Sequence, residues 1–332
     1  MKNMTSYNSE YDSQVLKVSN KIRDSLHNST ILKTNIFQKR AQGFWDQLWT
    51  CLDTVNHTEI AILEFESLEK DVFLKAPNNL TFGLLQNLYV QQDSLNNLSE
   101  SILGKPIKVW TDKYPSFSLI RNIRNITIGH PTKKESKKSH VREYCVIDQS
   151  SLTKDGFSFW VWSSAGFNQQ HVRFSELIEK QREALITELK KILKHIENQE
   201  LEHKKTFKAQ SLSKLLPSGE PYSLSVLNKL AYDQLGWIMF QDYKHKYVEI
   251  KSGLEKRYGE LNQTLRIPGT KLLIDELDRI FQRIEELKYG GSDMEIDLNI
   301  YSDALVDRLK ELKTHLDEID EEFKTKKLSA RG

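Results

Sequence analysis

Three residues whose side chains suit proton transfer and anion binding lie close together near the middle of the chain. Arg124 and Asn125 are followed by His130, six residues after the arginine. An imidazole titrates near neutral pH and can therefore accept and donate protons under physiological conditions. A guanidinium stays charged and binds phosphate oxygens through two parallel N–H groups. The combination therefore suits proton transfer next to a phosphate.

A predicted helix must hold these residues in place. Its apolar positions lie at helical spacing, and the sequence Gly129-His130-Pro131 marks its end. Six residues span nearly two helical turns, so Arg124 and His130 converge on one side if the chain bends at the glycine. The apolar positions that define this helix are Leu119, Ile120, Ile123, Ile126 and Ile128.

The same residues resemble a known family motif. Arg124, a polar residue beside it, four further residues and then His130 match the R-x(4–6)-H signature of the HEPN superfamily. Some bacterial HEPN proteins pair a run similar to Ile123–Thr132 (IRNITIGHPT) with a run similar to Tyr89–Asp93 (YVQQD), and this chain contains both. The resemblance covers residues 31–132 and does not extend to the C-terminal third.

The resemblance implies a small helical bundle that forms a homodimer and brings two Arg/His pairs to a shared cleft. Many such proteins are metal-independent endoribonucleases, which implies RNA as the substrate, with no metal and no cofactor. In that role His130 would transfer the proton, Arg124 would stabilise the phosphate and Asn125 would orient the pair or the phosphate. The family setting further implies a toxin or antiviral defence effector, with an antitoxin or regulatory protein as a possible partner.

Further residues are expected to support this site. Gln86, Tyr89 and Asp93 lie at positions i, i+3 and i+7, which places them on one face of a predicted helix. Asp93 would hold an imidazole or an arginine, and Arg121, one turn before Arg124, adds positive charge. A basic segment after the motif would attract RNA by releasing counterions. Its basic residues, interrupted by Glu135 alone, are Lys133, Lys134, Lys137, Lys138 and Arg142.

Structural roles are the alternative for each of these residues. Arg124 would pair with Asp93, and His130 would interact with the dipole at the helix end. Gln86, Tyr89 and Asp93 would form a buried polar network that fixes helix packing. The lysine-rich segment would be a solvated loop. Three tryptophans are interpreted as packing residues rather than as stacking platforms for bases, namely Trp110, Trp160 and Trp162.

For the whole protein, the alternative to a ribonuclease is a catalytically inactive helical module that binds RNA or another protein. Other enzyme classes find no support in the sequence. It contains no G-x-x-x-x-G-K-[ST] loop for nucleotide phosphates and no G-x-G-x-x-G after a strand. It also contains no H-E-x-x-H motif and no cluster of cysteine and histidine, so a zinc enzyme is not indicated.

The composition predicts an all-α protein. Only 14 glycines and 7 prolines in 332 residues leave too few turns for a sandwich or a barrel. Aromatic and β-branched residues within 144–162 predict one small β-hairpin, with its turn at Thr153–Gly156. Helices are expected over residues 14–26, 31–52, 60–68, 82–98, 115–128, 175–208, 226–258, 271–289 and 302–324.

These elements are grouped into an N-terminal helix (1–30), a HEPN-like helical domain (31–210) and a C-terminal helical domain (211–332). Two prolines and a glycine within 211–223 indicate the second boundary. The last two helices carry heptad-like apolar stripes that predict an antiparallel bundle or a coiled-coil-like pairing, with the bundle favoured because each stripe spans fewer than three heptads. The stripes are Leu273, Leu277, Ile280, Ile284 and Leu287, and then Leu305, Leu309, Leu312, Leu316, Ile319 and Phe323.

Charge, cysteine content and hydropathy constrain the partners and the location. A net charge of +2 excludes a histone-like polycation but allows a local basic patch. Cys51 and Cys145 have no neighbours at metal-ligand spacing and are expected to be free thiols in a reducing compartment. Without an apolar leader or a run of eighteen apolar residues, the sequence predicts a cytoplasmic protein with no membrane partner.

Overall fold

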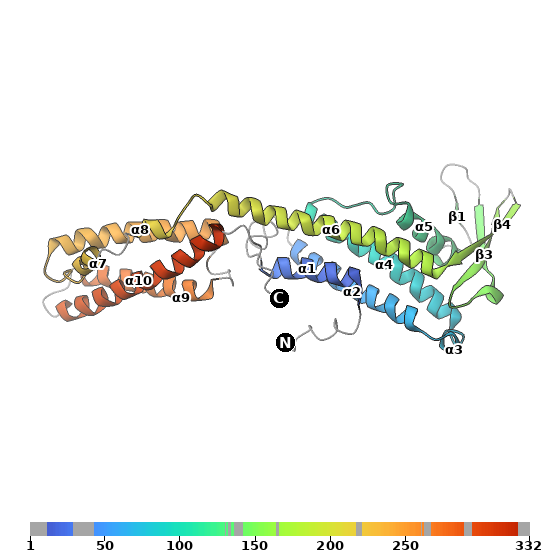
Figure 1. Ribbon diagram of the computed structural model, residues 1–332, viewed down its shortest axis with the longest axis horizontal. Helices are drawn as coiled ribbons and strands as arrows, with labels where there is room; N and C mark the ends of the chain where they lie inside the picture. The colour runs from blue at the N-terminus through green and yellow to red at the C-terminus, as the bar shows by residue number, and fades with distance from the viewer. Residues whose placement is uncertain are drawn as a thin grey trace. The chain divides into compact units, whose positions relative to one another are not determined.

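The computed structural model of the chain describes residues 12–28, 43–129, 131, 134–135, 142–163, 166–216, 221–259, 261, 267–288 and 294–324 (Figure 1). The described residues form two compact units. Of the described residues, unit 1 contains those within 12–27 and 43–197, and unit 2 contains residue 28 and those within 198–324. The division lies inside α6 (Phe174–Phe207), upstream of residues 211–223, where the sequence predicted a boundary. Helix α6 crosses it because its 34 residues include no glycine or proline.

Unit 1 is a helical bundle with a sheet at one end. Helix α1 (Gln14–Asn28) and helix α2 (Phe44–Ser67) run antiparallel. The pairing order shows this, because Ser13 just before α1 bonds Glu59 late in α2, whereas Arg23 bonds the earlier Asp53. After the four-residue α3 (Lys70–Phe73) come α4 (Pro77–Leu103), α5 (Pro115–Arg124) and the π-helical turn η3 (Asn125–Gly129).

Helix α2 corrects one expectation from the sequence. Separate helices were predicted over 31–52 and 60–68, but residues 44–67 form one helix. The intervening residues 53–59 contain neither glycine nor proline, so nothing interrupts the backbone hydrogen bonds there. Residues 31–42 of the predicted first helix lie outside the described residues. The long α2 can therefore pack along most of α4, with which it makes the most extensive helix contact of the unit.

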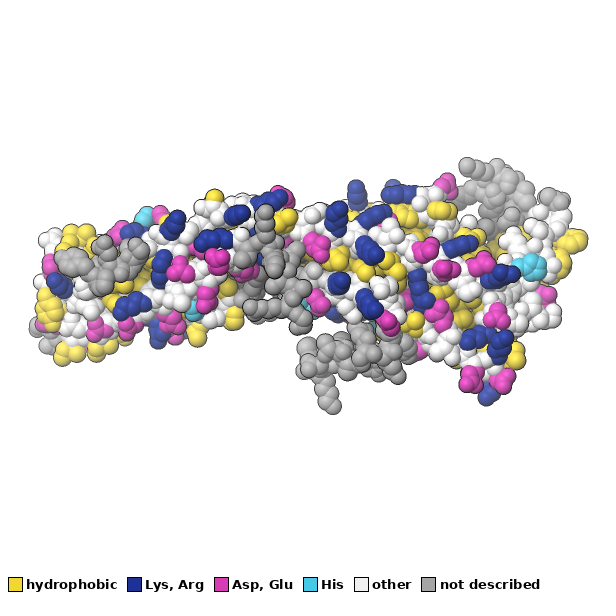
Figure 2. All heavy atoms as spheres, viewed as in Figure 1, with side chains coloured by type: hydrophobic (Ala, Val, Ile, Leu, Met, Phe, Trp, Pro, Cys, Tyr) yellow, Lys and Arg dark blue, Asp and Glu magenta, His cyan; other side chains and the backbone are white. Residues whose placement is uncertain are grey.

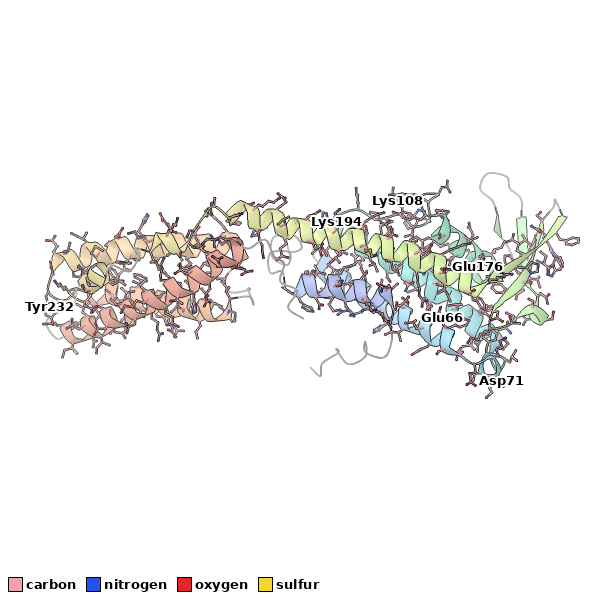
Figure 3. The ribbon with its side chains drawn as sticks, viewed as in Figure 1. Glu66, Asp71, Lys108, Glu176, Lys194 and Tyr232 are labelled. Atoms are coloured by element: carbon pink, nitrogen blue, oxygen red, sulfur yellow. The ribbon has the colours of Figure 1, made fainter. Side chains whose placement is uncertain are left out.

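A buried polar network joins the helices of unit 1. The carboxylate of Glu59 is fully buried and accepts hydrogen bonds from Ser13 Oγ (2.7 Å), Gln91 Nε2 (3.3 Å) and Arg182 Nε (2.8 Å). Arg182, on α6, also donates two bonds to Glu66 at the end of α2, which Figure 3 labels. Burial alone would lower the pKa of Arg182, but its bonds to both glutamates outweigh burial and raise it. The arginine is therefore the counter-charge of a buried carboxylate.

Replacing Arg182 with alanine is expected to lower the free energy of unfolding of unit 1 by about 3 kcal/mol, because Glu59 would keep a buried charge without its cation. Urea unfolding followed by tryptophan fluorescence measures this, since five of the six tryptophans lie in unit 1. The matched control is Arg173→Ala, which removes an exposed pair with Glu176 (labelled in Figure 3) worth about 0.5 kcal/mol. Equal effects of the two variants would contradict the structural role of Arg182.

The β-structure is larger than the predicted hairpin. Strands β2 (Arg142–Ile147) and β3 (Gly156–Ser163) form the expected antiparallel hairpin, but β4 (Gly166–Arg173) extends it and the two-residue β1 (Lys134–Glu135) adds to the other edge. The sequence of β4 gave no strand signal because Val172 is its one buried residue. Its other positions are exposed or half-buried and mostly polar, so they show no apolar alternation.

The sheet covers the helices with one face. Residues at alternate positions of β2, β3 and β4 pack in one core cluster with the apolar residues of α5 and η3. The helical members of this cluster include Ile120, Ile123 and Ile126, and the strand members are Cys145, Phe157, Phe159 and Val172. Burial raises the pKa of the Cys145 thiol to about 11, so this cysteine is protonated at neutral pH. The sheet therefore seals one side of the helix that carries the Arg124 motif.

Unit 2 is a bundle in which the predicted apolar stripes are buried. Its long helices are α8 (Gln234–Tyr258), α9 (Pro268–Leu287) and α10 (Glu295–Lys324), shown in orange to red in Figure 1. Helices α8 and α9 run antiparallel, because Lys244 pairs with Glu285 whereas the later Lys251 pairs with the earlier Asp278. Ten of the eleven predicted stripe residues are buried, and Ile280 is partly buried against the same core.

One predicted helix of unit 2 is divided. Residues 226–258 were expected to form a single helix, but α7 (Pro221–Leu227) and α8 are separate. Asp233 explains the division, because its carboxylate accepts a hydrogen bond from Leu235 N and caps the start of α8. A short 3₁₀-helical turn, η5 (Ser213–Leu215), precedes α7. In the described part of the chain, no helix combines the length and apolar character needed to cross a membrane.

Candidate active site at the end of helix α5

Helix α4 brings the predicted supporting residues to the motif helix. Asp93 Oδ1 accepts a hydrogen bond from Arg121 Nη1 at 2.8 Å. Two turns earlier on α4, Gln86 Oε1 accepts bonds from Arg124 Nε at 3.2 Å and Nη2 at 2.9 Å. The two helices therefore run antiparallel, and the helical spacing of Gln86, Tyr89 and Asp93 places all three against α5, as predicted. We call Gln86, Tyr89, Asp93, Arg121 and Arg124 the Tyr89 cluster.

The ring of Tyr89 lies against both arginines of the cluster. The guanidinium carbon of Arg121 is 4.0 Å from the ring centroid and that of Arg124 is 4.6 Å from it. A cation near the face of an aromatic ring is attracted by about 0.5–2 kcal/mol. The ring therefore holds two positive charges close together, and among the described residues a carboxylate partner is found for Arg121 but not for Arg124. Trp110, whose centroid is 5.9 Å from the same Arg121 carbon, extends the aromatic surface.

Arg124 is held by neutral groups. Its partners are the amide oxygens of Gln86 and of Asn125, the latter 3.1 Å from Nη1. Among the residues that the structure describes, no carboxylate lies within ion-pair distance of Arg124. A guanidinium has five N–H donors. Arg124 uses three of them in its bonds to Gln86 and Asn125, and the other two N–H groups reach no acceptor among the described residues. Arg124 is thus oriented, and no carboxylate of the described residues neutralises its charge, which is the state required to bind an anion.

The alternative that Arg124 forms a structural pair with Asp93 does not hold, because Asp93 binds Arg121 instead. The alternative of a buried polar network formed by Gln86, Tyr89 and Asp93 does not hold either. Gln86 is exposed, and Tyr89 and Asp93 are half-buried. Of the two arginines, Arg121 is the structural one, with only 12% of its side chain exposed.

A π-helical turn follows Arg124 and differs from the glycine-terminated α-helix that the sequence predicted. Residues Asn125–Gly129 form η3, in which a residue lies above the fifth residue before it rather than the fourth. Gly129 is therefore placed over Arg124. Its φ is not positive, so a left-handed cap is not the reason for glycine here. A Cβ at position 129 would lie 2.8 Å from Arg124 Nη1, so glycine leaves the space that the guanidinium occupies.

Replacing Gly129 with alanine is therefore expected to displace the Arg124 guanidinium without unfolding the protein. The clash involves the far end of a flexible side chain, and alanine is favoured over glycine in a helix by about 0.5–1 kcal/mol. Any activity that depends on Arg124 should fall at least ten-fold, whereas the melting temperature should stay equal or rise. A matched control is Gly83→Ala on α4, where the added Cβ meets nothing. An unchanged activity in Gly129→Ala would contradict this geometry.

Other predicted site residues fall at the edge of the described structure. His130 and Lys133 lie outside the described residues, and Lys134 is described only as part of β1, where it pairs with Glu143. The backbone is described again at Pro131, whose carbonyl accepts a hydrogen bond from Cys145 N at 2.8 Å. Pro131 therefore lies beside β2, and in the sequence His130 occupies the one position between Gly129 and Pro131.

Two residues of the YVQQD run have a role that the sequence interpretation missed. Gln91 and Gln92 are fully buried, and Gln181 of α6 donates to Gln91 Oε1 (2.8 Å) and accepts from Gln92 Nε2 (2.7 Å). A signal for this was present, because Gln91 continues the apolar spacing of Leu88 and Leu95 on α4. These glutamines fix the α4–α6 contact and do not reach the Tyr89 cluster.

Within the described part of the chain, no group of three or more histidine, cysteine, aspartate or glutamate side chains has an arrangement that could hold a metal ion. Comparisons with protein-family descriptions, with curated proteins and with solved structures found no match to this chain. The site is therefore interpreted from its own residues and geometry.

Proposed function

We propose that the protein is a metal-independent endoribonuclease of the HEPN type. The observation that carries the proposal is Arg124, a cation fixed by Gln86, Asn125 and the Tyr89 ring but not neutralised by a carboxylate of the described structure. Arg124 directly precedes the π-helical turn, and His130 is the next residue in the sequence after that turn. In RNA the anion next to the 2′-hydroxyl is a backbone phosphate, and a pre-oriented guanidinium is well suited to stabilise it.

The proposed reaction is an internal transesterification of RNA. The 2′-oxygen forms a bond to the neighbouring phosphorus, and the bond from phosphorus to the 5′-oxygen breaks. The imidazole of His130 takes the 2′-hydroxyl proton, and the leaving 5′-oxygen receives a proton from an imidazolium or from water. Arg124 neutralises the charge that builds on the phosphoryl oxygens, and Asn125 keeps Arg124 in place. The products are a 2′,3′-cyclic phosphate and a 5′-hydroxyl.

A homodimer that joins two such sites in one cleft is part of the proposal, as is control by an antitoxin or another regulatory protein. A role as a toxin or antiviral defence effector fits an enzyme that cuts RNA and must be restrained. The second candidate function is a catalytically inactive module that binds RNA or protein. It is favoured by a different observation, the exposed aromatic residues Tyr144, Trp162 and Phe167 on the sheet.

Cleavage assays with purified protein separate the two functions. Single-stranded RNA is incubated with the protein in EDTA, and the product ends are identified by mass spectrometry. We expect 2′,3′-cyclic phosphate ends, and we expect His130→Ala to abolish them while the circular dichroism spectrum stays unchanged. The control His57→Ala removes an exposed histidine of α2 and should cut RNA normally. Cleavage that persists in His130→Ala, or that EDTA abolishes, contradicts the proposal.

A further inference from the structure

The sheet of unit 1 has an outer face, opposite the face that covers α5. The register places Tyr144, Trp162 and Phe167 directly beside one another across β2, β3 and β4. In the next row, Val146, Trp160 and Gln169 are neighbours, and the ring centroids of Trp160 and Phe167 are 5.7 Å apart. Directly opposed side chains in antiparallel strands are about 5 Å apart, so the rings form a continuous surface. Figure 2 shows hydrophobic side chains at the surface of this end of the unit.

The aromatic row is open to solvent. The exposed fraction is 44% for Tyr144, 49% for Trp162 and 73% for Phe167. This corrects the interpretation of the tryptophans as packing residues, at least for Trp162 and for Trp110, which is 54% exposed. A contiguous exposed apolar surface on a folded unit marks a place where something binds.

The composition of the face selects the kind of partner. Its nine described positions on β2, β3 and β4 include no carboxylate. Beyond the four aromatic residues and Val146, the positions are Ser158, Gln169, His171 and Arg173. The sequence from Lys133 to Arg142 has five basic residues and one acidic residue. Lys134 lies in β1, at the edge of the sheet, and Arg142 is the first residue of β2. The described face is thus aromatic and hydrogen-bonding, and the sequence that joins β1 to β2 is cationic.

We propose that this outer face binds single-stranded RNA by stacking unpaired bases on Tyr144, Trp162 and Phe167. The inference rests on the proposed function, which makes RNA the substrate, and it specifies that substrate as unpaired. Bases in a duplex keep their faces stacked on each other, so they cannot stack on the rings. A polyanion also suits the basic sequence beside the face, whereas a second copy of the chain would bring two basic segments together. The amide of Gln169 and the imidazole of His171 offer hydrogen bonds to base edges.

The outer face is connected to the end of the motif helix through β2 and Pro131. Strand β2 carries Tyr144, and the next residue, Cys145, donates its backbone N–H to Pro131, directly after His130. The rings lie on the side of the sheet that faces away from α5, because the alternate residues pack against Ile120 and Ile123. A bound strand therefore has to pass the sheet edge to reach Arg124.

Fluorescence anisotropy with a labelled twelve-nucleotide RNA of unstructured sequence tests the proposal, with His130→Ala as the background so that the RNA stays intact. We expect Trp162→Ala and Phe167→Ala to weaken binding five- to a hundred-fold each, the range for loss of one base–aromatic stack. Trp162→Phe keeps a ring and should bind within about three-fold of the background. The control Tyr232→Ala removes an equally exposed aromatic residue of unit 2, labelled in Figure 3, and should bind normally.

Three outcomes decide the matter. Weaker binding in both ring-deletion variants, with intact affinity in the control, supports the proposal. Unchanged affinity in both ring-deletion variants overturns the proposal. If light scattering also shows that these variants dissociate a dimer, the face binds a second copy of the chain instead of RNA. Cleavage of a dinucleotide by the chain with an intact His130 is measured separately. If the intact chain also fails to cleave the twelve-nucleotide RNA while the rings still determine binding, the proposed ribonuclease function fails and the RNA-binding face stands.

Discussion

Arg124→Ala is expected to lower the rate of RNA cleavage by about a thousand-fold, with little change in the stability of unit 1. Removing one pre-oriented group that stabilises developing charge costs a hundred- to a thousand-fold in comparable sites, and loss of an arginine at a phosphate costs more. Stability should change little because the partners of Arg124 are two neutral amides and part of a ring face. Single-turnover cleavage of a labelled RNA, with a thermal melt of each variant, measures both quantities.

The neighbouring arginine supplies a matched control. Arg121 is on the same helix and contacts the same Tyr89 ring, but its charge is neutralised by Asp93. Arg121→Ala should therefore reduce cleavage much less and stability more, because it leaves Asp93 without its cation. Arg124→Lys should recover only part of the rate, since an ammonium keeps the charge but not the planar fork of donors. Equal losses of cleavage in Arg121→Ala and Arg124→Ala would show that general positive charge, not the position of Arg124, matters.

The largest expected loss of stability is in unit 2, at the pair formed by Arg257 and Asp320. Both side chains are buried, with exposed fractions of 0% and 2%, and Arg257 Nη1 donates to Asp320 Oδ1 at 2.8 Å. Asp320 also accepts bonds from Ser211 Oγ (2.7 Å) and from the backbone of Leu212 and Ser213. The carboxylate therefore ties the chain segment after α6 to α8 and α10.

Arg257→Met is expected to lower the free energy of unfolding of unit 2 by about 3–5 kcal/mol, because Asp320 then keeps a buried charge without its cation. Hydrogen exchange of the α8 and α10 amides measures the stability of this unit separately from unit 1. The double variant Arg257→Met with Asp320→Leu should recover part of the loss, since it removes both charges. Full additivity of the two substitutions would contradict a direct pair.

The same carboxylate predicts a dependence of stability on pH. Burial alone would raise the pKa of Asp320, but the hydrogen bonds from Ser211, Ser213 and Arg257 outweigh burial and lower it from 3.8 to about 2. A carboxylate with a lowered pKa in the folded state stabilises the fold above the unfolded-state pKa and loses this effect as the pH falls through the folded-state value. Unit 2 should therefore lose about 2 kcal/mol between pH 4 and pH 2, and Asp320→Asn should remove this dependence.

The helices were predictable because their apolar stripes are long and regular. In α9 and α10 the spacing of Leu277, Ile284, Leu309 and Leu316 allows one buried face and no other, so the bundle follows from the sequence. Strand β4 was not predictable in the same way. Its hydrogen bonds to β3 stabilise it, and a strand with one buried residue leaves no periodic signal. Because β4 was not predicted, the large exposed face of the sheet was not predicted either.

At the site, helical spacing predicted which residues of α4 face the motif but not how they pair. Gln86 and Asp93 had to lie on one face, yet only the relative position of α4 and α5 assigns Asp93 to Arg121 and Gln86 to Arg124. The π-helical turn was not predictable either, because the apolar spacing of Ile120, Ile123 and Ile126 fits an ordinary α-helix. The role of Gly129 follows from that turn and not from its own conformational freedom.

The proposed chemistry is tested most directly with DNA oligonucleotides that contain one ribonucleotide between flanks of random sequence, incubated with the protein in EDTA. Only that ribonucleotide has a 2′-hydroxyl that can attack the neighbouring phosphorus. We expect a single cut on its 3′ side, with a 2′,3′-cyclic phosphate on one product and a 5′-hydroxyl on the other, and no cut by Arg124→Ala or His130→Ala. Cleavage of the all-DNA control, products with 3′-hydroxyl ends, or no cleavage by the unaltered protein would contradict an RNA transesterase at Arg124 and His130.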